Sequence, residues 1–359
     1  MAIRRLIAAA TAIGLVLTAA LPAAAHGIGH DAGYAVTVLV TGPSPDGDLV
    51  NAWGLSRSAT SPWWIADNST NLSTVYRADG SKLAAPRVAI PGTANHDGTP
   101  TGTVNNPAAG AGDFNGDAFL FSSEAGLITG WRGALGSTAE IGNSDFADNA
   151  VYKGLAIGSA TIGGTTAQYL YASDFHNRRI DIFDRTFHAQ TWAGAFVDPN
   201  LPKGYGPFGI QNLDGTIYVT YALTQAGSTD EVAGDGLGAV DAFATDGTFR
   251  GRVATHGPLN APWGLAWAPD SFGRASGDLI VGNFGDGTLH AYHWDGSRWR
   301  KAGALRDADH EQLVIDGLWA IQFGGGVNLV NDGPATTLFY TAGPNDEAAG
   351  AFGTITAAP

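Results

Sequence analysis

The sequence predicts an all-β protein folded as a six-bladed β-propeller, with the ring closed by an N-terminal strand. Three observations lead to this prediction. The 359 residues include 51 Gly but only 14% charged residues, a composition typical of short strands joined by tight turns. A short motif centred on Gly recurs six times along the chain. No segment after the first 25 residues has a sustained apolar period of 3.6, so no helix is predicted.

The motif consists of an aromatic or polar residue, a Gly and, in most copies, an aliphatic residue. Its middle positions lie 48 to 56 residues apart, which indicates one structural unit per copy. The last copy has Ala in place of Gly. The six copies are Trp53-Gly54-Leu55, Thr101-Gly102-Thr103, Lys153-Gly154-Leu155, Phe208-Gly209-Ile210, Trp263-Gly264-Leu265 and Trp319-Ala320-Ile321. Six such units can bury their faces by stacking around an axis, whereas a solenoid, the alternative, predicts shorter repeats.

Each copy is followed by two predicted strands. The first is a short apolar run, which we interpret as the innermost strand of its blade; the six runs are 63–66, 119–122, 169–172, 217–220, 279–282 and 338–341. The second alternates apolar and polar residues with a period of two, as in 179–184 and 239–243. Asp-Gly pairs such as Asp246-Gly247 close these strands as tight turns.

One further strand is predicted before the first copy, over the apolar run 34–40. We expect it to form the outer strand of the last blade. Closure of the ring by this strand leaves the terminal blades without exposed edges.

The first 25 residues have the pattern of a secretory signal peptide. Arg4 and Arg5 precede the apolar run 6–21, and small residues up to Ala25 form a cleavage site. Cleavage leaves 26–359 as a single propeller domain and changes the net charge from −14 to −16, because both arginines are lost. We expect a secreted monomer, extracellular or periplasmic, with no membrane anchor. Its acidic surface disfavours nucleic acid as a partner.

Several phrases of the sequence resemble a family of secreted, NHL-like six-bladed propellers of bacteria and fungi. The phrases are Asn51-Ala52-Trp53-Gly54-Leu55, Asp174-Phe175-His176-Asn177, Asp198-Pro199-Asn200-Leu201-Pro202, Asn283-Phe284-Gly285-Asp286-Gly287, Asp316-Gly317-Leu318-Trp319 and Ala342-Gly343-Pro344-Asn345-Asp346-Glu347. The blade pattern is more distantly similar to streptogramin-lyase-like and gluconolactonase-like propellers. The resemblance implies the propeller fold, but such relatives include binding proteins, a lyase and metal-dependent lactonases, so it implies no single activity.

Polar residues directly follow the predicted innermost strands, where the loops of a propeller converge on one mouth of its central channel. We predict that ligand-binding residues lie there. The candidates are Asp67, Asn68, Asp174, Asn177, Tyr221 and Asp286. For any single Asp or Asn the alternative is turn formation, in which the side chain bonds to its own backbone. Their recurrence at matching places in the repeat favours a site.

A ring of oxygen ligands suits Ca²⁺ or another divalent cation. The gluconolactonase-like relatives hold such an ion with Glu, Asn and Asp. By analogy, that resemblance implies Glu124, Asn283 and Asp346 as metal ligands here. No nucleotide or redox cofactor is expected, because no phosphate-binding loop and no Cys ligand is present.

Two histidines are candidate general bases if the protein is an enzyme. His176 directly follows a predicted innermost strand, and His96 lies in a loop before the second motif copy. A loop histidine bonded to backbone or water is the alternative for both. No nucleophilic serine elbow and no zinc-protease motif occurs.

Three functions are compatible with these residues. The first is a secreted binding propeller whose acidic mouth takes a cation, a glycan, a peptide or a small molecule. The second is a metal-dependent hydrolase, lactonase or polysaccharide lyase that uses the same mouth. The third is a structural surface protein, which predicts self-association. We favour the first, because it requires an acidic mouth and no catalytic constellation.

Overall fold

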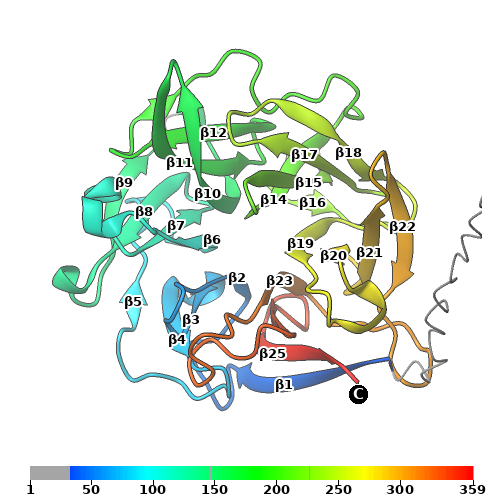
Figure 1. The fold of residues 1–359 in the computed structure, drawn as a ribbon. Coiled ribbons are helices and arrows are strands. Elements are labelled where there is room, and N and C mark those ends of the chain that lie inside the picture. Colours follow the sequence, from blue (N-terminus) through cyan, green and yellow to red (C-terminus); the bar gives the residue numbers. More distant parts are fainter. Residues whose placement is uncertain (1–32, 145–147, 226, 359) are drawn as a thin grey trace, which may run out of the picture. The chain divides into compact units, whose positions relative to one another are not determined.

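The structure, a computed structural model, is a six-bladed β-propeller (Figure 1). It describes residues 33–144, 148–225 and 227–358. Six antiparallel sheets are arranged around a central axis, and the described residues contain no α-helix. The predicted signal peptide lies outside the described residues. Among the described residues, no helix has the length and hydropathy to cross a membrane.

Each blade has four antiparallel strands that follow one another from the axis outwards. The innermost strands are β2 (Ala52–Ser56), β6 (Pro100–Asn105), β10 (Tyr152–Ile162), β14 (Tyr205–Leu213), β19 (Pro262–Trp267) and β23 (Leu318–Phe323). The second strands are β3 (Trp63–Asp67), β7 (Phe119–Ser123), β11 (Thr165–Asp174), β15 (Thr216–Thr224), β20 (Leu279–Asn283) and β24 (Thr337–Ala342).

The strands in the outer half of the blades vary more in length. The third strands are β4 (Leu72–Tyr76), β8 (Leu127–Trp131), β12 (Arg179–Asp184), β17 (Ala239–Ala244), β21 (Leu289–Trp294) and β25 (Gly350–Ala357). The fourth strands are β5 (Val88–Ala89), β9 (Glu140–Ser144), β13 (Ala189–Gln190), β18 (Phe249–Thr255), β22 (Trp299–Ala304) and β1 (Tyr34–Gly42). Blade 4 has an additional strand, β16 (Glu231–Val232), which pairs with β15.

Short 3-10 turns occupy some of the connections. They are η1 (Asn68–Thr70), η2 (Ala109–Ala111), η3 (Asp113–Gly116), η4 (Gly133–Leu135) and η6 (Gly273–Ala275).

The structure corrects one part of the predicted blade. The apolar runs that the sequence analysis interpreted as innermost strands are the second strands, and the motif itself forms the innermost strand. The reason is the close approach of neighbouring blades at the axis. A Cβ atom on Gly209, for example, would lie 2.1 Å from the carbonyl oxygen of Trp263 in the next blade. Gly therefore serves as a packing residue inside a strand, where sequence propensity disfavours it.

Gly209→Ala is accordingly expected to destabilise the protein by about 2 kcal/mol, because the added methyl group meets backbone that cannot move alone. Urea denaturation measures the change. Gly110→Ala is the matched control, since its Cβ would meet nothing within 4 Å. An equal effect of the two substitutions would contradict the close-approach explanation.

The predicted closure of the ring by the N-terminal strand is confirmed. Strand β1 pairs antiparallel with β25, from Tyr34 opposite Ala357 to Gly42 opposite Gly350 (Figure 1). Near the axis, a buried hydroxyl completes the same junction: Thr341 Oγ1 in blade 6 donates to the carbonyl oxygen of Trp53 in blade 1 at 2.5 Å. The ring is therefore closed both at its rim and at its centre.

Candidate functional site at the mouth of the channel

One end of the central channel collects most of the predicted site residues. Because the strands are antiparallel, the innermost strands begin at the same end at which the second strands finish. The loops before β6 and β10 therefore meet the turns after β7 and β11. We call this end the mouth.

The first position of the motif lies near the start of each innermost strand, at the mouth. Its six residues are Trp53, Thr101, Lys153, Phe208, Trp263 and Trp319. All but Thr101, whose hydroxyl donates to Tyr152 O, are linked by contacts across the axis. Trp53 stacks on Trp319 with ring centroids 3.6 Å apart and an interplanar angle of 23°. Phe284, from the turn after β20, stacks on Trp319 at 4.0 Å. The motif tryptophans thus pack across the axis as an aromatic plug.

Lys153 is the charged member of this ring and is 2% exposed. Its Nζ lies 2.6 Å from Glu124 Oε1 and 5.1 Å from the ring centroid of Trp53. Burial acts to lower the pKa of Lys153, but the carboxylates of Glu124 and Glu231 outweigh it, and the pKa is raised. The lysine is therefore a permanently positive group in the floor of the mouth.

Hydrogen bonds fix Glu124 from its other side. Trp319 Nε1 donates to Asn51 Oδ1 at 3.0 Å, and Asn51 Nδ2 donates to Asn68 Oδ1 at 3.4 Å. Asn68 Nδ2 in turn donates to Glu124 Oε2 at 3.0 Å. Both carboxylate oxygens of Glu124 thus have partners, so its orientation is set by blades 1, 3 and 6 together.

Two further carboxyl groups lie close enough to Glu124 and Lys153 to act on their charges. Glu231 comes from β16, and Glu347 from the turn between β24 and β25. Burial, followed by the charges of Glu231 and Glu124, raises the pKa of Glu347 to about 7. Burial also raises the pKa of Glu231, against the effect of Lys153. Because the pKa of Glu347 is near 7, the mouth carries more negative charge above pH 7 than below it.

The turn that carries Glu347 is strained. Asn345, Asp346 and Glu347 all have left-handed backbone conformations, with φ of 58°, 52° and 64°. Consecutive non-glycine residues in this region cost conformational energy and persist only where the surroundings impose them. The packing around this turn therefore imposes the conformation that presents the Glu347 carboxyl group at the mouth.

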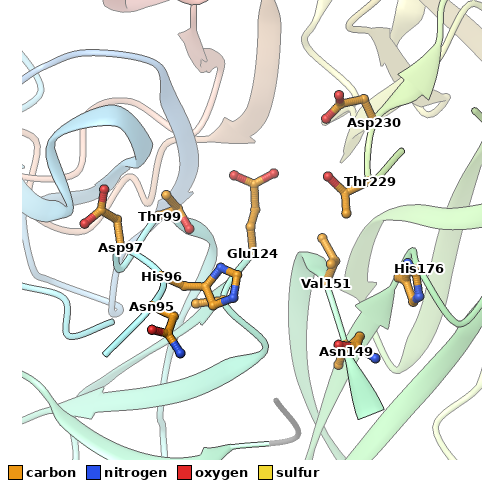
Figure 2. A pocket seen from close by; sticks show the side chains of 12 residues that line it. Asn95, His96, Asp97, Thr99, Glu124, Asn149, Val151, His176, Thr229 and Asp230 are labelled. Carbon is orange, nitrogen blue, oxygen red and sulfur yellow. The ribbon is translucent and has the colours of Figure 1, made fainter. Parts of the chain in front are cut away.

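A pocket of about 730 Å³ opens beside this floor, over blades 2 to 4. Figure 2 shows His96, Asp97 and Glu124 on one side, with His176 and Asp230 across from them. The two candidate bases of the sequence analysis therefore share one pocket with Glu124. Among the described residues that line it, three are carboxylates and none is Lys or Arg.

Two predicted ligand-binding residues lie inside their blades. Asp67 is buried and accepts a hydrogen bond from Thr74 Oγ1 at 2.7 Å, and burial raises its pKa well above the ordinary value. Tyr221 is buried beside Asp241, and burial raises its pKa too. Asn68, the neighbour of Asp67, is by contrast part of the hydrogen-bonded chain at the mouth.

Asp174 and Asn177 shape the turn after β11. Asp174 Oδ1 accepts the backbone N–H groups of Val151 and Asn177 at 3.2 and 3.1 Å, and Oδ2 accepts Asn177 Nδ2 at 2.7 Å. These bonds tie the loop before β10 to the turn that carries His176. Both residues thus position the pocket wall.

Asn283 and Asp286 likewise shape a turn, the one that follows β20 in blade 5. Asn283 Oδ1 accepts the N–H of Asn260 at 3.2 Å, and its Nδ2 donates to Pro258 O at 2.8 Å. Asp286 Oδ1 accepts the hydroxyl of Thr288 at 2.6 Å. At these positions, an Asp or Asn after a strand therefore serves mainly to form the turn.

The three predicted metal ligands do not form a common set of free oxygen donors. Glu124 is bound by Lys153 and Asn68, and the amide oxygen of Asn283 is bound by backbone. Asp346 is exposed on its strained turn. Within the described ranges, no three His, Asp or Glu side chains are grouped to hold a metal ion. The donors present therefore do not fit a divalent cation, and no step below depends on one.

Sequence reasoning missed Lys153, Asn51 and Glu231 as site residues. Glu231 forms β16 and acts on the charge of Lys153. The signal for Lys153 was present: it occupies a motif position that holds Trp in three of the six copies. A charged residue at a repeat position that is aromatic in four of the six copies indicates that this side chain does more than pack.

With this geometry, the class of protein is defined: a six-bladed β-propeller with an acidic mouth. No family model matches the chain. Two uncharacterized proteins of Acanthamoeba polyphaga mimivirus are each 30% identical to it over 286 residues. The matches cover 76% of this chain and 68% and 73% of the viral proteins. The chain belongs to the family of these proteins.

Solved structures support the fold alone. A streptogramin B lyase superposes with a TM-score of 0.52, at 12% identity over 91% of this chain and 99% of the lyase. The soluble aldose sugar dehydrogenase of Escherichia coli also gives 0.52, at 12% identity over 90% of this chain and all of the enzyme. Such different activities on one fold leave function to be argued from the site.

Proposed function

We propose that this protein is a secreted binding propeller whose mouth pocket takes a small polar ligand that carries a positively charged group. The supporting observation is the lining of the pocket, in which Asp97, Glu124 and Asp230 surround about 730 Å³ without a basic Lys or Arg side chain among the described residues. Glu347, whose pKa is raised to about 7, adds negative charge to the same mouth above that pH.

The spacing of these groups favours an organic cation. Glu124 is held by Lys153 and Asn68, whereas Asp97 and Asp230 are exposed on opposite sides of the pocket (Figure 2). Carboxylates spread around a wide pocket suit an ammonium group on a larger molecule. Such a cation is attracted by the combined negative potential of all the carboxylates. Asn95, Thr99 and Asn149 supply hydrogen-bonding groups for the rest of such a ligand.

The first test is calorimetry with spermidine and choline, and with glucose as an uncharged probe. We expect the two ammonium compounds to bind, more weakly at high salt, because exposed charges are screened. The double variant Asp97→Asn/Asp230→Asn should weaken binding by about tenfold, equivalent to about 1.4 kcal/mol. Both side chains are exposed, so the fold should be unaffected.

Asp235→Asn is the matched control. Asp235 is an exposed acid in the same segment as Asp230, between β15 and β17, but it does not line the pocket. It should bind as the parent protein does. Failure of both ammonium probes to bind, or equal binding by the two variants, would contradict the proposal.

A second candidate function rests on the histidines. His96 and His176 lie in the same pocket as Glu124, an arrangement that can supply a general base and acid. The corresponding activity is that of a hydrolase, lactonase or polysaccharide lyase. Turnover of a lactone or polysaccharide that is lost in His176→Ala would support it, and turnover unchanged by that substitution would remove His176 from the mechanism.

A further inference from the structure

A second surface feature lies at the opposite end of the blades from the mouth. Trp267 ends β19, Trp294 ends β21 and Trp299 begins β22, so all three lie where blades 4 and 5 meet, away from the mouth. Trp267 is 37% and Trp294 44% exposed. We call these three residues, with Tyr218 beneath them, the aromatic patch.

The rings of the aromatic patch form a continuous row. The Trp267 and Trp299 centroids are 6.0 Å apart, and those of Trp299 and Trp294 are 5.4 Å apart. Tyr218 of β15 lies 6.1 Å from Trp299 and 6.4 Å from Trp267. Two blades therefore contribute to one aromatic surface. Large side chains gathered in the open commonly mark a binding site.

The indole N–H groups of the patch are available as donors. Trp131, Trp263 and Trp319 each donate to a protein oxygen. Within the described part of the chain, the indole N–H groups of Trp267, Trp294 and Trp299 form no such bond. Each exposed ring thus offers a flat apolar face together with a free polar edge.

Charged groups frame the rings on both sides. On blade 4, Arg250 and Asp214 lie close enough to the Tyr218 hydroxyl to act on its pKa, which burial raises to about 12. On blade 5, Arg300 Nε donates to Asp295 Oδ2 at 2.6 Å, beside Trp294. Arg298 Nε lies 3.7 Å from the same carboxylate oxygen. The rim therefore contains both guanidinium donors and carboxylate acceptors.

We propose that the aromatic patch is a binding site for an uncharged oligosaccharide. A sugar ring has a flat C–H face and a hydroxyl edge, which match an indole face and a rim of mixed donors and acceptors. A stable protein partner needs about 800 Å² on each side, far more than a few partly exposed rings within a charged surface provide. The net charge of −14 further disfavours an acidic polymer.

Affinity electrophoresis tests the proposal, with gels containing soluble β-1,3-glucan, xylan, galactomannan or starch. At least one of these polysaccharides should retard the protein. Trp267→Ala and Trp294→Ala should each weaken that retardation by about tenfold, because each removes one stacking face. Calorimetry with the matching four- to six-sugar oligosaccharide gives the affinity directly.

Trp192→Ala is the matched control, because Trp192 is a half-buried indole on blade 3 whose ring neighbours are Tyr169 and Tyr171. It should be retarded as the parent protein is, and so should the mouth variant Asp97→Asn/Asp230→Asn. Migration unaffected by all four polysaccharides, or retardation unchanged in both patch variants, would overturn the proposal. Neither result bears on the mouth pocket.

Discussion

Glu124→Gln is expected to lower the free energy of unfolding by about 3 kcal/mol, because it leaves the ammonium group of Lys153 buried without its main partner. The substitution keeps the size of the side chain and its bond to Asn68. Glu231 remains near the lysine and offsets part of the loss. Urea denaturation, with an unchanged dependence on urea concentration, measures the effect.

Two further variants isolate this ion pair. The double variant Glu124→Gln/Lys153→Met should recover most of the lost stability, because no charge is then stranded. Glu140→Gln is the matched control: its ion pair with Arg132 is also on blade 2 but is more exposed, with the two side chains 27% and 32% accessible. For Glu140→Gln we expect a loss of about 0.5 kcal/mol in the free energy of unfolding. Equal losses at the two sites would show that burial of Lys153 has no energetic role.

Trp319→Ala is expected to destabilise the protein by about 4 kcal/mol, because it opens a cavity at the centre of the plug. Trp319 is fully buried, stacks on Trp53 and Phe284, and anchors Asn51 through its indole N–H. Loss of that anchor also releases the hydrogen-bonded chain that orients Glu124. Thermal and urea denaturation give the change in stability.

Trp319→Phe separates packing from hydrogen bonding, since it keeps a ring in the stack but removes the donor to Asn51. A loss of about 1–2 kcal/mol is expected for it. Trp294→Ala, at an exposed indole, should change stability by less than about 0.5 kcal/mol. A Trp319→Ala protein as stable as Trp294→Ala would contradict the view that the plug holds the blades together.

The fold was predictable because each of its signals repeats. The motif positions, the apolar runs and the closing strand each have a local pattern, and six copies make the arrangement around an axis the natural solution. The assignment of the innermost strand failed for a physical reason. Gly disfavours strands in isolation, and its role appears only when the neighbouring backbone, such as Trp263 O beside Gly209, is in place.

The site was predictable only in outline. The sequence indicated that His96, Glu124 and His176 belong near one mouth, and the structure places them in one pocket. It did not show that Lys153 pairs with Glu124, because the two residues come from different blades and meet only where these neighbouring blades pack together. Nor did it separate Asn68, which faces the mouth, from Asn283, whose amide holds its own turn.

The positive charge at the mouth is the ammonium group of Lys153, where the sequence resemblance implied a divalent cation. Metal content of the purified protein, together with melting curves with and without a chelator, tests it most directly. We expect no stoichiometric divalent metal and the same melting temperature in both curves. Stoichiometric Ca²⁺ whose removal lowers the melting temperature would contradict the claim, because a ligand bound to the folded state raises its stability.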